Sequence, residues 1–315
     1  MKPLRKFFDT HKPKFTTGGA LEKYFPIYDV FENLFYSSDK RTFGAVHIRD
    51  SIDLQKVMVV VWMATFPAMF YGMYNLGFQS LSAFQEIGSI NKDDWHFIFI
   101  DLLCNYDPKS IWDCIWFGAC YFIPIYLVTF IVGIAWEVIF AIVRGHEINE
   151  GAFVTTVLFA LCCPPDAPLW QVALGISFGI VVAKEIFGGT GKNFLNPALA
   201  GRAFLYFAYP VDWSGDSVWV AVDGYSSPTI LGIGAQEGLN GIQAQYSWFD
   251  AFLGSIPGSI GETSTLFILI GLIILLYTRV ASWRVIAGVL LGTFVTSELF
   301  NFIGCLLYTS PSPRD

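Results

Sequence analysis

Long apolar segments, separated by short polar stretches, constrain the fold of this chain more than any other feature. A helix needs about 20 mostly apolar residues to cross the hydrocarbon core of a bilayer. Seven segments qualify, some of them narrowly: 57–77, 112–143, 151–166, 168–187, 194–210, 264–280 and 282–305. Only 14% of the residues are charged, against about 25% in soluble domains. The chain is therefore predicted to be all-α, a polytopic transmembrane helical bundle.

The distribution of positive charge predicts the orientation of these spans. Nine of the 19 Lys and Arg residues lie within the first 49 positions, and none lies between Arg202 and Arg279. Cytoplasmic loops of membrane proteins carry an excess of Lys and Arg. We therefore place the basic segment 1–56 in the cytoplasm and the loops 78–111 and 211–263 outside. A basic tail beside a first span indicates contact with the lipid bilayer, and nucleic acid is not an expected partner.

The segments next to the spans carry further signals. Residues 16–39 alternate aromatic and charged groups, which predicts an amphipathic segment at the membrane interface or on a partner. The basic start lacks the apolar core of a cleavable signal peptide. Segment 112–143 is too long for a simple span, so it tilts, breaks near Pro124 or continues past the membrane. The transmembrane domain is expected to cover 57–305, and we interpret the abruptly polar 306–315 as a truncated or frameshifted tail.

The cysteines do not predict a metal centre. They are Cys104, Cys114, Cys120, Cys162, Cys163 and Cys305. None forms a C-x-x-C pair or a four-cysteine cluster, the spacings typical of zinc and iron–sulfur sites. Most are expected to be small apolar fillers of the core.

The motif Asp223-Gly-Tyr-Ser-Ser-Pro-Thr229, in the loop 211–263, carries the strongest chemical signal. A threonine hydroxyl can be esterified by a phosphate only where an enzyme can reach it. Turn-forming neighbours provide such exposure, and the motif supplies Gly224, Ser226, Ser227 and Pro228. Taken alone, the same residues also fit an ordinary polar turn.

A second motif, at a predicted inner face of the membrane, runs from Phe187 to Phe204. Its Gly-Thr-Gly-Lys resembles part of a phosphate loop, but Lys192 is followed by Asn rather than Ser or Thr, which excludes a nucleoside triphosphate site. Asn193 and Asn196 could offer amide donors and acceptors to a planar heterocycle. They could equally cap the helix that begins at Pro197.

Several long blocks in order resemble the B-subunit family of sodium-translocating NADH:quinone oxidoreductases, from about Leu21 to Gly304. The D subunit of the related Rnf complex shares the fold. The matching blocks are residues 47–54, 66–75, 143–151, 188–204 and 257–262. The resemblance implies an inverted-repeat, urea-transporter-like fold. It also implies a place in a six-subunit complex of the bacterial inner membrane, with sodium-associated acidic residues beyond the matched part of the family sequence.

The resemblance also implies two flavins. The family carries covalent FMN on the threonine of a Ser-Gly-Ala-Thr signature, attached by an enzyme outside the cytoplasm. The matching residues here are Ser226, Ser227, Pro228 and the acceptor Thr229, with the leading Asp223 retained. A noncovalent riboflavin lies beside two asparagines in the family, which match Asn193 and Asn196.

A quinone site is implied where the family has a Gly-Gly pair before Trp-Glu. The matching residues here are Gly133, Ile134, Trp136 and Glu137, so isoleucine replaces the second glycine. A carboxylate inside an apolar helix is costly, which makes Glu137 a functional candidate in its own right. Its alternative role is that of an ordinary interfacial residue at a helix end.

The function implied is electron relay from NADH, through partner subunits, to FMN, riboflavin and ubiquinone, coupled to Na+ export. Two alternatives remain open at the level of sequence. One is a small-solute channel or transporter, because such proteins share the implied fold. The other is a scaffold subunit without a cofactor.

Overall fold

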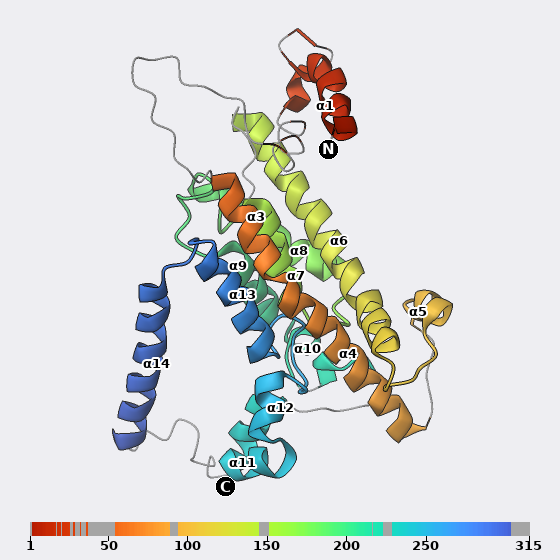
Figure 1. The fold of residues 1–315 in the computed structure, drawn as a ribbon, viewed down its shortest axis with the longest axis vertical. Coiled ribbons are helices and arrows are strands. Elements are labelled where there is room, and N and C mark those ends of the chain that lie inside the picture. Colours follow the sequence, from red (N-terminus) through yellow and green to blue (C-terminus); the bar gives the residue numbers. More distant parts are fainter. Residues whose placement is uncertain are drawn as a thin grey trace.

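The computed structural model describes residues 2–303, apart from 17, 20, 26–27, 29–31, 33–35, 37–53, 89–93, 145–150, 216 and 223–228. Over these ranges the chain forms helices and connections and contains no strand (Figure 1). The predicted all-α class is therefore confirmed. The inverted repeat stays a prediction.

Each of the predicted apolar segments contains a long helix. The long helices are α3 (Leu54–Ala64), α4 (Phe66–Ile87), α6 (Ile111–Arg144), α7 (Gly151–Leu161), α8 (Leu169–Val181), α9 (Pro197–Ala208), α13 (Thr265–Tyr277) and α14 (Trp283–Ile303). Shorter helices are α1 (Lys2–Phe15), α5 (Phe97–Leu103), α10 (Pro210–Trp213), α11 (Ile230–Gln245) and α12 (Trp248–Leu253). The 3-10 turns are Glu22–Tyr24, Glu185–Phe187 and Ser217–Trp219.

Four stretches in the described ranges are long and apolar enough to cross a membrane. They are Lys56–Ile87, Ile111–Arg144, Leu169–Phe187 and Trp283–Phe300. The chain is thus a multi-pass membrane protein. Residues 78–87 continue α4, so the connection to α5 begins after Ile87.

The central helix is α6, which packs against α4, α7 and α8. Its 34 residues span about 51 Å at 1.5 Å per residue, more than the hydrocarbon core of about 30 Å. The helix continues through Pro124 instead of ending there. Membrane helices tolerate proline when neighbouring helices cover the affected turn. α6 therefore links the two ends of the molecule.

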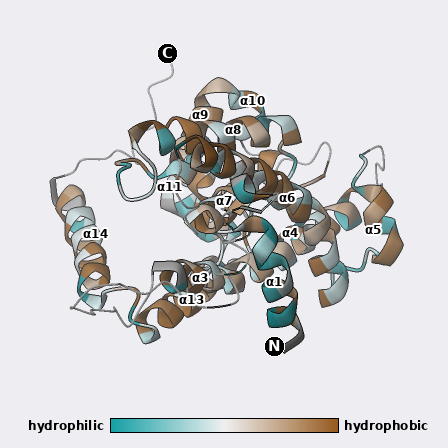
Figure 2. Ribbon diagram, turned by 90° about the horizontal axis from the view of Figure 1, so that it is seen from above, coloured by the Kyte–Doolittle hydropathy of each residue, from teal (hydrophilic) through white to brown (hydrophobic). Residues whose placement is uncertain are grey.

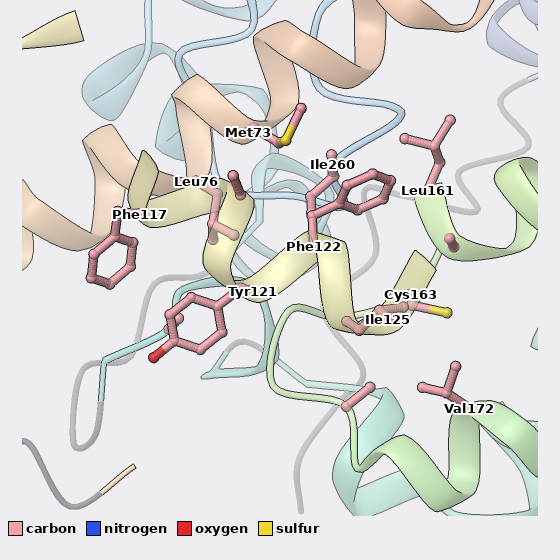
Figure 3. Close-up of a cluster of buried hydrophobic side chains, with 14 of the residues drawn as sticks. Met73, Leu76, Phe117, Tyr121, Phe122, Ile125, Leu161, Cys163, Val172 and Ile260 are labelled. Atoms are coloured by element: carbon pink, nitrogen blue, oxygen red, sulfur yellow. The ribbon is translucent and has the colours of Figure 1, made fainter. Parts of the chain in front are cut away.

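The largest apolar core lies between α4, α6, α7 and α8 (Figure 3). Met73 and Leu76 of α4 face Phe117 and Phe122 of α6 in this cluster. The two helices approach closely at Gly118, where a Cβ atom would lie 1.9 Å from the Met73 carbonyl oxygen. Small residues at such crossings let membrane helices gain packing energy from close backbone contact.

The two ends of the molecule differ in character. α1 lies at one end and α11 and α12 at the other (Figure 1). α1 is strongly hydrophilic, whereas the helices of the body are mostly hydrophobic (Figure 2). α14 stands apart from the body and exposes large apolar side chains such as Val289 and Phe294. Such a surface on a candidate span is suited to lipid or to a partner helix.

Candidate functional site

The residues predicted to form a quinone site lie in the second half of α6. Gly133 is buried at the point where α6 crosses α7 and α8. A Cβ atom there would lie 2.6 Å from Thr156 Cγ2 and 3.2 Å from Ile180 Cδ1. The absence of a side chain at Gly133 therefore lets the three helices meet.

Trp136 and Ile134 contact different neighbours of α6. The Trp136 Nε1 atom donates a hydrogen bond of 2.9 Å to Ser177 Oγ on α8. Ile134 packs instead against a small cluster formed by Ala141 and Phe153. The structure thus connects Trp136 and Glu137 to α8 and the residues after it, while Ile134 packs in a separate apolar cluster that includes Phe153 of α7.

Glu137 is deeply buried and forms an ion pair with Lys184, just beyond the end of α8. The two side chains are only 2% and 3% exposed. Burial of a charged group is costly unless an opposite charge and hydrogen bonds compensate it. Glu137 is therefore not an exposed helix-end residue. Lys184 was not among the predicted site residues, although a lysine at the end of an apolar segment is a usable signal.

A second ion pair joins the same two elements. Arg144 Nη1 donates to Glu185 Oε2 at 2.9 Å, and Arg144 Nη2 donates to the Glu185 carbonyl oxygen at 2.6 Å. The Glu185 side chain is 1% exposed. Both charged residues that follow α8 are thus bound to α6.

The loop after these residues reverses direction through glycines. Gly188, Gly189 and Gly191 have φ angles of 111°, 91° and 86°, a region that favours glycine. Asn193 then bonds within the loop. Its Oδ1 accepts from Gly191 N at 3.3 Å, and its Nδ2 donates to the Leu195 carbonyl at 2.7 Å.

Asn196 caps α9, the structural role considered for it above. Its Oδ1 accepts from Ala198 N at 2.9 Å and from Leu199 N at 3.3 Å. Among the residues that the structure describes, none accepts from its Nδ2 atom. One amide donor therefore remains for a ligand.

An exposed aromatic pair lies in the same loop. Phe194 is 74% exposed and meets Phe187 edge to face, with ring centroids 4.7 Å apart. This pair was not predicted from the sequence, although both residues stand within the second motif. Such rings could stack on a planar heterocycle.

Thr229 stands at the start of α11, at the end of the molecule opposite α1 (Figure 1). Its hydroxyl accepts a hydrogen bond of 3.1 Å from Gly232 N and so caps the helix. The rest of the predicted attachment motif, Asp223, Ser226, Ser227 and Pro228, lies outside the described residues.

A cavity of about 360 Å³ lies beside the segment that leads to this motif. Its lining includes Asp94, His96, Tyr121 and Val222. The Asp94 Oδ2 atom lies 2.6 Å from His96 Nδ1 and accepts from Tyr121 Oη at 3.2 Å. Burial lowers the pKa of His96, although the Asp94 carboxylate opposes this shift. The His96 imidazole that lines the cavity is therefore neutral near pH 7. Nowhere in the described residues do three His, Cys, Asp or Glu side chains gather as metal ligands.

Comparison with known proteins gives a consistent result. A family model described as the NQR2, RnfD, RnfE family matches residues 42–313. The chain is 56% identical over 303 residues to the B subunit of the Na(+)-translocating NADH-quinone reductase of Chromohalobacter salexigens, covering 96% of this chain and 73% of the relative. It is 54% identical over 304 residues to the protein of the same name from Pseudomonas aeruginosa strain LESB58, covering 96% and 75%. The Klebsiella pneumoniae protein of that name is 53% identical, with 96% and 76% covered.

Proposed function

Since this chain belongs to the NQR2, RnfD, RnfE family, we propose that it is a membrane subunit of a sodium-pumping NADH:quinone oxidoreductase. It would relay electrons from covalent FMN through riboflavin to ubiquinone, coupled to Na+ export. The observation that carries the proposal is an identity above half with relatives named for that reaction, over 96% of the chain. Partners would be the other subunits of a six-subunit complex in a bacterial inner membrane.

The orientation proposed for the chain follows its charge. A cytoplasmic N-terminus leaves the stretch between Arg202 and Arg279, which lacks Lys and Arg, outside. Thr229 would then face the compartment in which the flavin-attaching enzyme acts. The placement of α1 and α11 at opposite ends of the molecule supports this arrangement.

Thr229 fits the attachment of a phosphoester. A phosphate on its hydroxyl would stand at the N-terminus of α11, where free backbone N–H groups and the helix dipole favour negative charge. This matters because no Lys or Arg lies near Thr229 in sequence. Pro228 fixes its own φ and restricts Ser227, and Thr229 is extended with φ −67° and ψ 156°.

The loop 188–196 fits a noncovalent riboflavin in part. Asn196 Nδ2 provides a donor, and Phe194, two positions earlier in the loop, provides an exposed ring. Both side-chain atoms of Asn193 are already bonded within the loop, so Asn193 would act mainly by shaping it. Flavins supply the electron-transfer chemistry when bound, and the protein supplies position, charge and insulation from water.

Quinone binding is proposed along α6, at Gly133, Ile134, Trp136 and Glu137. The crossing at Gly133 and the bond from Trp136 to Ser177 hold this part of α6 rigidly against α8. Glu137, neutralised by Lys184, would add a fixed dipole and not a mobile charge. A rigid wall of this kind is what a preorganised site requires.

The test is flavin fluorescence of the chain after denaturing electrophoresis. The chain is produced in the complete complex together with the flavin-attaching enzyme. We expect a fluorescent wild-type band that disappears in Thr229→Ala, because the phosphoester oxygen is lost. The matched control Thr265→Ala, at an exposed threonine, should keep the fluorescence. A dark wild-type band would refute covalent FMN and favour a solute transporter or a scaffold. Mass spectrometry of the peptide containing Thr229 would confirm the added mass.

A further inference from the structure

Two ion pairs connect α6 to the residues that follow α8: Glu137–Lys184 is fully buried, whereas in Arg144–Glu185 only the glutamate is. α6 contributes one acid and one base, Glu137 and Arg144, seven positions apart and thus about two helical turns. The partner segment contributes the complementary base and acid, Lys184 and Glu185, at adjacent positions. The four formal charges cancel. Buried charges persist in membrane proteins when they are paired, and they then often mark functional positions.

The ion pairs continue into the backbone of the loop that follows. The Glu185 carbonyl accepts from Arg144 Nη2 at 2.6 Å and from Gly188 N at 2.9 Å. The Lys184 carbonyl accepts from Gly189 N at 3.2 Å. The first two residues of the loop 188–196 are thus bonded to the same two residues that hold α6.

A Cβ atom on Gly189 would lie 3.6 Å from Glu185 Oε1, so the loop passes directly over the second carboxylate. Lys184 itself is 3% exposed; its ammonium group pairs with Glu137 of α6, and its carbonyl oxygen accepts from Gly189 of this loop. The Lys184 side chain is therefore surrounded by protein groups and is not accessible to solvent or to a dissolved ligand.

We propose that Lys184 is a positioning residue that couples Glu137 on α6 to the loop 188–196. This inference rests on the proposed function, which assigns riboflavin to the loop and quinone to α6. Lys184 would touch neither ligand. It would neutralise Glu137 through its ammonium group and hold the start of the loop through its carbonyl. Charge at Glu137 would then affect where Asn193 and Asn196 stand, and the two binding regions would be mechanically linked.

A double-mutant cycle on the complete complex tests this coupling. The variants are Lys184→Met, Glu137→Gln and the two combined, and the readout is noncovalent riboflavin per covalent flavin on Thr229. Each single change should lower riboflavin content at least threefold, because it leaves one charge of the pair in place. The double variant, which lacks both charges, should retain more riboflavin than the product of the two single effects predicts.

Lys109→Met is the matched control, because Lys109 is an exposed lysine that lies outside both α6 and the loop 188–196. It should keep wild-type riboflavin content. The inference would be overturned by a wild-type riboflavin content in Lys184→Met. It would also be overturned if the riboflavin content of the double variant equalled the product of the two single effects. If the single-variant proteins do not accumulate in the membrane, the charge-reversed double variant Glu137→Lys with Lys184→Glu tests the coupling instead. Retained riboflavin supports the coupling, and its loss refutes it.

A second measurement separates this inference from the proposed function. A cysteine introduced as Thr190→Cys replaces a hydroxyl that is buried in the loop. In detergent, its reaction with a maleimide should accelerate several-fold when Lys184→Met is added, because the start of the loop loosens. Equal rates would refute the coupling. A wild-type complex without riboflavin would refute the riboflavin assignment, and the labelling rate would still decide the coupling.

Discussion

Asn196 caps a helix, and we propose that the same side chain also binds a ligand. Its Oδ1 atom caps α9, and its Nδ2 atom remains a donor. Asp accepts the same backbone bonds at an N-cap, but an ionised Asp has no N–H to offer. We expect Asn196→Asp to keep thermal stability and to lower riboflavin content several-fold. Asn196→Leu should lose riboflavin and also destabilise the helix by about 1 kcal/mol.

Both quantities can be measured on the purified complex, by thermal unfolding in detergent and by extraction of noncovalent flavin. The comparison of Asp with Leu separates the capping role from the binding role. Wild-type riboflavin content in Asn196→Asp would remove Asn196 from the site.

At this scale the sequence could predict which residues are unusual but not what they contact. The cost of a carboxylate in an apolar helix marked Glu137 as a candidate. Its partner Lys184 is 47 positions away, and only the packing of α8 on α6 brings the two together. The capping role of Asn196 was foreseeable, because an N-cap before proline is a local signal.

Among the elements, the continuity of α6 depends more on its contacts with neighbouring helices than on its own sequence. Apolar length predicted a helix in this segment, but local rules could not decide whether Pro124 would interrupt it. The helices that pack against α6 include α4 and α8, which are distant from Pro124 in sequence, so their support becomes visible only in the packed structure. The role of Gly133 could not be predicted locally either, because it lies in allowing α7 and α8 to approach α6 closely.

Gly133→Ala should therefore separate α6 from α7. The new Cβ would lie 2.6 Å from Thr156 Cγ2, and such overpacking costs about 1–3 kcal/mol. Thr156→Ser removes that methyl group while keeping the hydroxyl that bonds the Phe153 carbonyl at 3.0 Å. The combination of Gly133→Ala with Thr156→Ser should therefore regain most of the lost stability. Gly288→Ala, the same change where nothing lies within 4 Å, is the control. Denaturant or thermal unfolding in detergent measures the stability of all three variants. A Gly133→Ala variant as stable as the wild type would contradict the close contact between α6 and α7.

Across the whole molecule, the hydrophobic pattern was sufficient for the class of fold and the approximate positions of its long helices. It could not place those helices relative to one another, because apolar surfaces in a membrane carry little information about which neighbour they meet. The flavin motif illustrates the same limit. Thr229 is placed by its capping bond, whereas Asp223 and the residues up to Pro228 lie outside the described part of the chain.

The orientation in the membrane is the property of the whole chain on which the covalent flavin proposal depends. We expect α1 in the cytoplasm and α12 outside, since the basic residues gather near the start and α1 and α12 lie at opposite ends. Single cysteines at the exposed positions Thr10→Cys and Ser247→Cys, in a chain with its six cysteines replaced, report each end. A membrane-impermeant maleimide on intact cells should label Ser247→Cys and should reach Thr10→Cys only after permeabilisation.

Val289→Cys, on the apolar face of α14, provides the control for insertion. Maleimides react with the thiolate, which does not form in hydrocarbon, so this cysteine should label slowly before and after permeabilisation. Rapid labelling at Thr10→Cys in intact cells, with none at Ser247→Cys, would reverse the orientation. Thr229 would then face the cytoplasm, away from an enzyme that attaches flavin outside. The covalent assignment would fail even though the fold and the family membership would stand.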